Sequence, residues 1–188
     1  MITIFGATGD LSHRKLFPSI FHLYQQDNLD EHIAIIGIGR RDYNNEQFRD
    51  QVKASIQTYV KDTDRIDEFM THVFYHKTDV SDKESYQSLL QFSERLDSEF
   101  ALGGNRLFYL AMAPQFFGVI SDYLKSSGLT QTTGFKRLVI EKPFGSDLKS
   151  AESLNNQIRR SFKEEEIYRI DHYLSLIHIS EPTRRYAI

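Results

Sequence analysis

The residues best suited to binding an anionic group lie at the start of the chain, where an apolar run leads into two glycines. Gly6 and Gly9 follow residues 1–5, and a helical pattern begins at once. Glycine at a strand end permits a tight turn and lets the backbone approach a ligand closely. The amides and dipole of the next helix attract an anion. Although the spacing departs from G-x-G-x-x-G, and an ordinary turn into a helix is the alternative, we expect a dinucleotide pyrophosphate here.

Two arginines follow the second apolar run, residues 33–39. In a dinucleotide-binding fold an acidic residue at this point binds the free 2′-hydroxyl of NAD, whereas arginine accepts the 2′-phosphate of NADP. Here Arg40 and Arg41 occupy the position, and Asp42 comes later than usual. The pair favours NADP over NAD; a solvated pair in a loop is the alternative.

The first helix, expected over residues 12–26, carries cations where the helix dipole disfavours them. Asp10 or Ser12 is expected to cap it. Arg14 and Lys15 fall in its first turn. They either face a ligand or reach solvent, with Asp10 as a possible ion-pair partner.

Other polar residues follow later apolar runs. Asp79 and Val80 come after the third run, where an adenine ring could lie. Lys142 comes after the fifth, beside a proline and a glycine. A lysine there suits a phosphate or a hydroxyl, although such a residue is more often part of a surface turn.

Short apolar runs alternate with amphipathic segments, which predicts the elements that position these residues. Strands are expected at residues 1–5, 33–39, 73–75, 106–112 and 138–140, and later helices at 44–59, 81–100, 114–124 and 147–162, with a short turn at 66–70. Successive strand–helix units predict a parallel, doubly wound α/β sheet of the Rossmann type. Ligands bind such sheets beyond the carboxyl ends of the strands, where Gly6, Arg40, Asp79, Met112 and Lys142 would meet.

Two helix starts have the pattern of a capping box. They are Asn44 with Gln47, and Ser81 with Glu84. The residues expected to line buried helix faces include Leu16, Ile20 and Leu23, with Phe17 and Tyr24 beside them, and Phe48, Val52, Ile56, Tyr59, Phe116 and Phe117.

Composition limits the class of protein. The 188 residues carry a net charge of −3, with 40% hydrophobic residues, 26% charged residues and no cysteine. These values are ordinary for a soluble domain and give no reason to expect nucleic acid, a membrane or a thiolate metal site. No segment has the pattern of a signal peptide, and a cytoplasmic location is the expectation.

Four blocks of the sequence resemble the amino-terminal part of glucose-6-phosphate dehydrogenase, especially its bacterial members. They occur in family order and reach nearly to Leu174. The blocks are Phe5–Leu16, Phe108–Pro114, Glu141–Gly145 and Arg169–Leu174.

The resemblance implies oxidation of the anomeric carbon of glucose 6-phosphate, with hydride passing to NADP. The product would be a lactone, in the first step of the pentose phosphate pathway. It also implies that Arg40, with Arg41 beside it, binds the 2′-phosphate of NADP. The residues implied to hold the pyrophosphate are Gly6, Ala7, Thr8, Gly9, Asp10, Leu11, Ser12 and His13.

The substrate site is implied by the last two blocks. Lys142 would lie between the nicotinamide and the sugar, His172 with Tyr173 would bind the sugar phosphate, and Asp171 would orient a catalytic histidine. A carboxylate-supported imidazole suits removal of the C1 hydroxyl proton near neutral pH. In the family that histidine lies in a second, mostly antiparallel domain, and the surroundings of His178 do not match it. No metal is implied, and full-length members are expected to be homo-oligomers.

The sequence departs from the family after Leu174. Ser175 and Leu176 stand where the family has Gly-Lys, and residues 175–188 look like translated adapter sequence. We therefore expect an NADP-binding domain with the start of a substrate site at 1–174 and an anomalous tail at 175–188. A non-catalytic NADP-binding module is the alternative. A short-chain reductase is disfavoured, because no tyrosine is followed by lysine four residues later.

Overall fold

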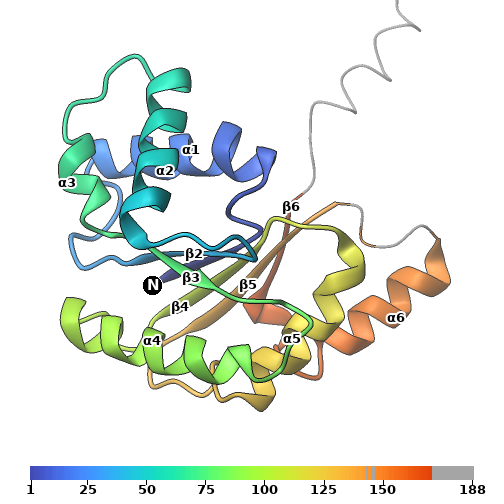
Figure 1. The fold of residues 1–188 in the computed structure, drawn as a ribbon. Helices are drawn as coiled ribbons and strands as arrows, with labels where there is room; N and C mark the ends of the chain where they lie inside the picture. The colour runs from blue at the N-terminus through green and yellow to red at the C-terminus, as the bar shows by residue number, and fades with distance from the viewer. Residues whose placement is uncertain (143, 145–146, 171–188) are drawn as a thin grey trace, which may run out of the picture.

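A computed structural model describes residues 1–142, 144 and 147–170 of the chain. Their centre is a six-stranded parallel sheet in the order β3-β2-β1-β4-β5-β6 (Figure 1). The strands are β1 (Ile2–Phe5), β2 (Ile35–Gly39), β3 (Val73–Lys77), β4 (Arg106–Leu110), β5 (Lys136–Glu141) and β6 (Ile167–Ile170). The order reverses at β1, as in a doubly wound fold, and confirms the predicted fold class.

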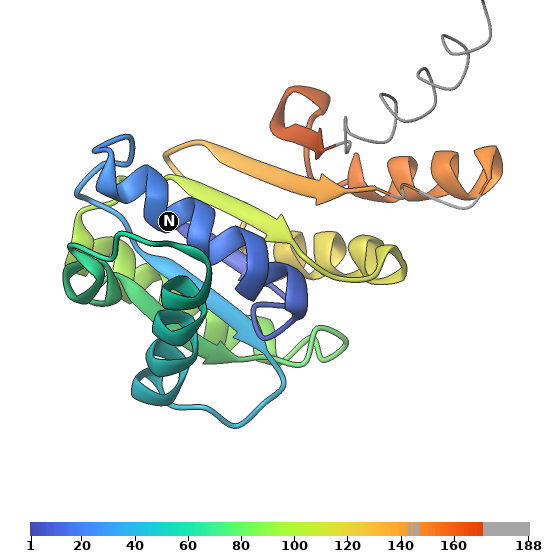
Figure 2. The same ribbon diagram turned by 90° about the horizontal axis from the view of Figure 1, so that it is seen from above.

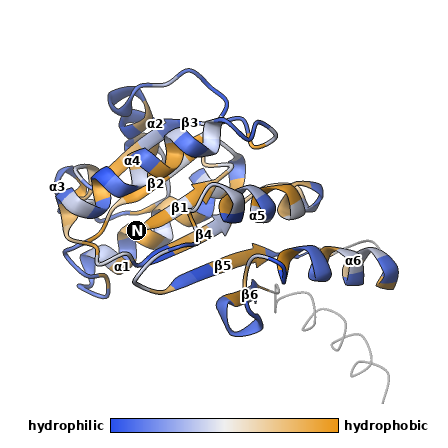
Figure 3. Ribbon diagram, turned by 90° about the horizontal axis from the view of Figure 1, so that it is seen from below, coloured by the Kyte–Doolittle hydropathy of each residue, from blue (hydrophilic) through white to orange (hydrophobic). Residues whose placement is uncertain are grey.

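Helices cover both faces of the sheet (Figures 1 and 2). One layer holds α1 (Phe17–Gln25), α2 (Asn45–Tyr59) and α3 (Ile66–Met70); the other holds α4 (Ser85–Phe100), α5 (Phe117–Ser126) and α6 (Leu148–Ile158). Short 3₁₀ turns lie at Pro114–Phe116 and Glu164–Glu166. Hydrophobic residues concentrate in the strands and polar residues along the outer helix surfaces (Figure 3). Within the described ranges, no helix is long and apolar enough to cross a bilayer.

Two core clusters fill the space between the layers. One packs Ile4, Ile35 and Val73 against the α1–α3 layer, and the other packs Phe108 and Ile140 against the α4–α6 layer. Burial on both faces explains why the strands form continuous apolar runs in the sequence.

The sixth strand was not among the predicted elements. β6 pairs in parallel with β5, in the register Leu138↔Ile167 to Glu141↔Ile170. Of its four residues only Ile167 is buried. A terminal strand that buries so little carries no apolar run, and it therefore leaves no periodic signal in the sequence.

The two predicted capping boxes have different outcomes. At α2, the Gln47 amide donates to Asn44 Oδ1 at 2.8 Å and the Asn44 amide to Gln47 Oε1 at 3.1 Å, which confirms the box. At Ser81 the prediction is wrong. The Ser81 amide donates to Asp79 Oδ1 at 2.9 Å, and α4 begins only at Ser85 without a side-chain cap.

The first helix begins with a π-helical turn at Ser12–Leu16. Neither Asp10 nor Ser12 caps it, contrary to expectation, and the Ser12 hydroxyl donates to the Gly6 carbonyl at 3.0 Å. The buried face of α1 is shifted from the expected stripe: Leu23 is 41% exposed, whereas Phe17 and Tyr24, expected beside that stripe, are buried. Two adjacent faces of this helix carry apolar residues, so the sequence alone could not determine which of them is buried.

The last turn of α2 also differs from its expectation. Tyr59, which was expected on the buried face, is 52% exposed, whereas Phe48, Val52 and Ile56 are fully buried.

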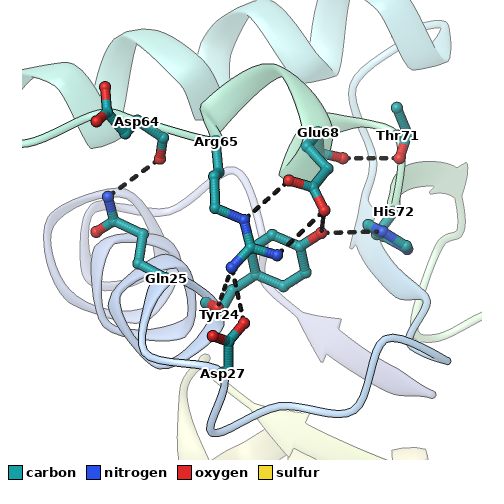
Figure 4. A network of polar contacts seen from close by, with 8 residues as sticks. All are labelled: Tyr24, Gln25, Asp27, Asp64, Arg65, Glu68, Thr71 and His72. Carbon is teal, nitrogen blue, oxygen red and sulfur yellow. Dashed lines mark hydrogen bonds and ion pairs between the residues drawn. The ribbon is translucent and has the colours of Figure 1, made fainter.

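A polar network joins α1 to α3 (Figure 4). Arg65 donates to Glu68 at 2.9 Å and to Asp27 at 2.8 Å, and its guanidinium lies 4.7 Å from the centre of the Tyr24 ring. The Tyr24 hydroxyl donates to Glu68 at 2.8 Å and lies 3.4 Å from Nε2 of His72. The network therefore fixes the carboxyl end of the helix whose amino end follows the glycine turn.

Candidate cofactor-binding site

A cleft of about 300 Å³ opens at the carboxyl edge of the sheet, where the parallel strands β1 to β4 end. Its walls are the turn after β1, the end of β2, the turn after β3 and the residues after β4. The lining residues are Gly6, Thr8, Gly9, Ile38, Gly39, Arg40, Thr78, Asp79, Val80, Ser81, Ala111, Met112 and Phe116. The cleft lies at the topological switch point, where ligands bind in doubly wound sheets.

The turn after β1 is held tightly against the neighbouring strands. Gly6 has a φ of +82°, and a Cβ atom there would meet the carbonyl oxygen of Ala111. The amides of Gly6 and Ala7 donate to the Ile38 carbonyl at 3.1 and 3.0 Å. Only glycine fits this position, and the arrangement brings bare backbone to the wall of the cleft.

The helix after this turn presents its positive end next to Gly9. Its first helical hydrogen bond runs from the His13 amide to the Gly9 carbonyl at 3.2 Å. The amides of residues 10–12 precede that bond, so they have no partner one helical turn earlier. Amides and dipole together fit the negative charge of a pyrophosphate. In the part of the chain that the structure describes, no group of histidine and acidic side chains could hold a metal ion.

The two arginines after β2 have different surroundings. Arg40 lines the cleft. Arg41 instead donates to the Tyr43 hydroxyl at 3.0 Å, and its carbonyl accepts a hydrogen bond from Tyr75 at 2.7 Å. Burial is the main cause that raises the pKa of Tyr75 to about 12, so this hydroxyl remains a donor. Arg40 is therefore the better placed of the two to meet a ligand in the cleft.

His13 lies half-buried on the π-helical turn. Its ring is 5.9 Å from that of Phe17, and its carbonyl accepts a hydrogen bond from Ser55 on α2. Burial, and next the positive charge of Arg41, lower the pKa of His13. The imidazole is therefore kept neutral near pH 7, and it adds no positive charge to the turn.

The turn after β3 forms the wall that contains Asp79 and Val80. The Thr78 amide donates to the Gly39 carbonyl at 3.0 Å, and the Tyr86 hydroxyl donates to the Val80 carbonyl at 3.1 Å. One carboxylate oxygen of Asp79 accepts from the Ser81 amide. These bonds fix the wall to β2 and α4. Asp79 stabilises the turn through its bond to the Ser81 amide and also lines the cleft.

Several residues expected to bind the cofactor lie away from the cleft surface. Ala7 and Ser12 are fully buried behind the turn. Asp10 is exposed and pairs with Arg14 at 3.2 Å, which favours the ion-pair interpretation of Arg14. Lys15 is also exposed.

Lys142 lies at the end of β5, with its amide donating to the Ile170 carbonyl at 3.2 Å. It is not among the residues that line the cleft in the described part of the chain. Asp171, His172, Tyr173, and the tail at 175–188 lie outside the described residues, so their expected roles stay predictions.

Six cleft residues were not predicted at the cleft: Ile38, Gly39, Thr78, Ser81, Ala111 and Phe116. Thr78 and Ser81 flank the predicted pair Asp79 and Val80, and their position just after a strand end was a signal that could have found them. Phe116 was expected to serve only as core packing. It lines the cleft because the 3₁₀ turn at Pro114–Phe116 places it before the helix proper.

Comparison with known proteins agrees with this architecture. A family profile described as "Glucose-6-phosphate dehydrogenase, NAD binding domain" matches residues 3–179. Glucose-6-phosphate 1-dehydrogenase of Bacillus subtilis is 53% identical over 174 residues, and that of Leuconostoc mesenteroides is 43% identical; each alignment covers 93% of this chain. The chain spans only 35% and 36% of these relatives, about a third of their length.

Solved structures give the same result. One described as glucose-6-phosphate dehydrogenase in complex with its substrate glucose-6-phosphate superposes with a TM-score of 0.83 at 38% identity, over 92% of this chain and 36% of that one. The enzyme from Mycobacterium avium superposes with a TM-score of 0.78 at 30% identity, with the same coverage of 92% and 36%. Sequence and fold together show that the chain belongs to the family of glucose-6-phosphate dehydrogenase NAD-binding domains.

Proposed function

We propose that the chain supplies the dinucleotide site of an NADP-dependent glucose-6-phosphate dehydrogenase. That enzyme would oxidise the C1 hydroxyl of glucose 6-phosphate to a lactone. The observation that carries the proposal is a single cleft lined both by the glycine turn and by Arg40. It combines a site for a pyrophosphate with a cation for a 2′-phosphate. The printed description of one solved relative supports the substrate, since it names glucose-6-phosphate.

Different residues of the site would bind different parts of the cofactor. The turn from Gly6 to His13 would hold the pyrophosphate, Arg40 the 2′-phosphate, and Asp79 with Val80 the adenosine. When bound, NADP accepts the hydride that leaves C1 of the sugar. Lys142 would contact both cofactor and sugar.

The proposed roles of the last block concern the sugar. His172 and Tyr173 would bind its phosphate, and Asp171 would orient the general-base histidine contributed by the rest of the enzyme. The proposal includes a domain at 1–174, a foreign segment at 175–188, a cytoplasmic location and homo-oligomers of the full-length enzyme.

Calorimetric titration with NADP and NAD tests the cofactor assignment. We expect NADP to bind more tightly, and Arg40→Ala to remove the preference, because a charge-assisted hydrogen bond contributes about 1.5–3 kcal/mol, roughly 10- to 150-fold in affinity. Arg41→Ala is the matched control, since Arg41 contacts Tyr43, and it should retain most of the preference. Equal affinity of the unchanged chain for the two dinucleotides would contradict the proposal.

A non-catalytic NADP-binding module remains the second candidate, favoured by the glycine turn and Arg40, which line one cleft among the described residues. Both functions predict that the 188 residues alone bind NADP but reduce it at a negligible rate. Resequencing the encoding DNA past codon 174 separates them. A frame that continues into Gly-Lys and a second domain supports the enzyme, whereas a confirmed stop after Ile188 supports the module.

A further inference from the structure

A histidine on β3 is hydrogen-bonded to a residue of the cleft wall. Nδ1 of His76 lies 2.7 Å from Oγ1 of Thr78. The two residues are two positions apart, so their side chains leave an extended backbone on the same face. Thr78 is only 1% exposed, yet it lines the cleft. The pair therefore joins the body of the sheet to the wall.

The wall beyond Thr78 is joined to α4 through side-chain hydroxyls, from Ser85 to the Asp79 carbonyl at 3.0 Å and from Tyr86 to the Val80 carbonyl at 3.1 Å. α4 begins at Ser85, and its N-terminus has no side-chain cap. The backbone of the segment at 78–81 is also held from the other side, by the bond from the Thr78 amide to the Gly39 carbonyl of β2. The His76 contact is the bond that fixes the side chain of Thr78 itself.

The surroundings of His76 keep its imidazole in place and neutral. The ring lies 5.2 Å from that of Phe92 on α4, which in turn has the Arg95 guanidinium 4.8 Å from its centre. Burial alone lowers the pKa of His76, so Nδ1 can accept a hydrogen bond from the Thr78 hydroxyl at neutral pH.

We propose that His76 is a positioning residue for the adenosine half of the dinucleotide: it fixes the Thr78 hydroxyl, and with it the wall at 78–81. The inference rests on the proposed function, because it needs a dinucleotide in the cleft. His76 would touch no part of the ligand and would act through Thr78. It differs in this from Arg40, which would contact one phosphate and set the preference between NADP and NAD.

Two pairs of variants of the full chain separate the hydrogen bond from packing. His76→Phe keeps an aromatic ring against Phe92 and removes the acceptor, whereas His76→Asn keeps an acceptor near the position of Nδ1. Thr78→Val keeps the side-chain shape and removes the hydroxyl, whereas Thr78→Ser keeps it. The probes are NADP, NAD and adenosine 2′,5′-bisphosphate, each titrated by calorimetry.

We expect His76→Phe and Thr78→Val each to weaken NADP and adenosine 2′,5′-bisphosphate by roughly 3- to 10-fold, the range of one net hydrogen bond. Because the two side chains act as one unit, the double variant should lose no more than either single variant. His76→Asn and Thr78→Ser should bind within about 2-fold of the unchanged chain, and the ratio of NADP to NAD affinity should stay constant.

The control is His72→Phe, which alters the histidine that precedes the same strand. His72 contacts Tyr24 and the Ile33 carbonyl, remote from the cleft, so this variant should lower the melting temperature without changing affinity. Three outcomes would each overturn the positioning role of His76 while leaving the proposed function intact. They are unchanged affinity in His76→Phe, additive losses in the double variant, and a loss in His76→Asn equal to that in His76→Phe.

If a His76 variant fails to fold, the Thr78→Val and Thr78→Ser pair decides the result. If the unchanged chain binds none of the three probes, the proposed function and this inference both fail. Those two failures are thereby distinguishable.

Discussion

Gly6 is the residue on which the shape of the cleft depends most directly. Its φ of +82° lies in the left-handed region, and any Cβ would meet the Ala111 carbonyl oxygen. We expect Gly6→Ala to destabilise the fold by about 1–3 kcal/mol and to abolish measurable NADP binding, because the turn must move away from β4 to relieve the contact. Urea unfolding and calorimetry measure the two effects.

Gly103→Ala provides the matched control for Gly6. Gly103 has a comparable φ of +65°, but a Cβ there meets nothing closer than the Asn105 side chain at 3.8 Å. Gly103→Ala should lower the free energy of unfolding by only ~1 kcal/mol, because of its unfavourable backbone conformation, and should leave NADP affinity unchanged. Equal losses of stability in the two variants would show that the contact with Ala111 is unimportant.

The arginine pair shows how far single residues could be predicted. The types and position of Arg40 and Arg41 indicated a phosphate-binding pair, and Arg40 does line the cleft. The sequence could not separate their roles, because the partner of Arg41 is a hydroxyl whose position depends on how the chain leaves β2. Contacts of that kind are set by tertiary packing and leave no trace in local spacing.

Among the elements, the contact of α1 with α3 should depend on pH. The hydrogen bonds from Arg65, and then from Tyr24, lower the pKa of Glu68 from 4.5 to about 2. A lowered carboxyl pKa stabilises the fold above 4.5, and that stabilisation is lost as the pH falls from 4.5 towards 2. We expect the melting temperature to drop across this interval.

Glu68→Gln isolates the contribution of this carboxylate, since other acidic groups titrate over the same range. The variant should melt below the unchanged chain at pH 7 and should show a shallower fall between pH 4.5 and 2. Superimposable pH profiles of the two proteins would rule out a role for Glu68 in acid stability. NADP affinity at pH 7 should be the same in both, because the network lies at the far end of α1.

The capping box at α2 should have a measurable effect on stability. Asn44→Ala removes the acceptor of the Gln47 amide, and we expect a loss of about 1 kcal/mol in urea unfolding. Asn44→Asp keeps an acceptor at the helix start and should restore most of it. A loss below about 0.3 kcal/mol in Asn44→Ala would mean that solvent replaces the cap fully.

The helix starts and β6 also mark what the sequence could predict of the elements. The Asn44 box was predictable because both partners are local. The similar pattern at Ser81 failed because the Asp79 carboxylate competes for the Ser81 amide and delays the start of α4. Five strands were predictable from their short apolar runs, whereas β6 depends on pairing with β5, a long-range contact without a local pattern.

On the scale of the whole molecule, the two helical layers cover the sheet unequally. Figure 2 shows β5 beyond the cover of α1 and α2, on the side where these helices lie over the other strands. Leu138 and Ile140 point into the α4–α6 core, so alternation places Val139 and Glu141 on the opposite, uncovered face. The register places Tyr168 beside Val139 and Ile170 beside Glu141. On this face Val139 is buried, whereas the apolar side chains of Tyr168 and Ile170 on the terminal strand are exposed.

Exposure of this face predicts self-association of the 188-residue chain. Tyr168 is 46% exposed and Ile170 38% exposed, and both lie on β6, the edge strand of the sheet among the described residues, where another chain can pair. We expect light scattering to show a mass that rises with concentration. The double variant Tyr168→Lys with Ile170→Lys should stay monomeric to higher concentration, because charge on an edge strand opposes pairing. Its free energy of unfolding should change by less than about 1 kcal/mol, since both side chains are only partly buried. A monomeric mass at every concentration in the unchanged chain would show that the uncovered face does not drive association.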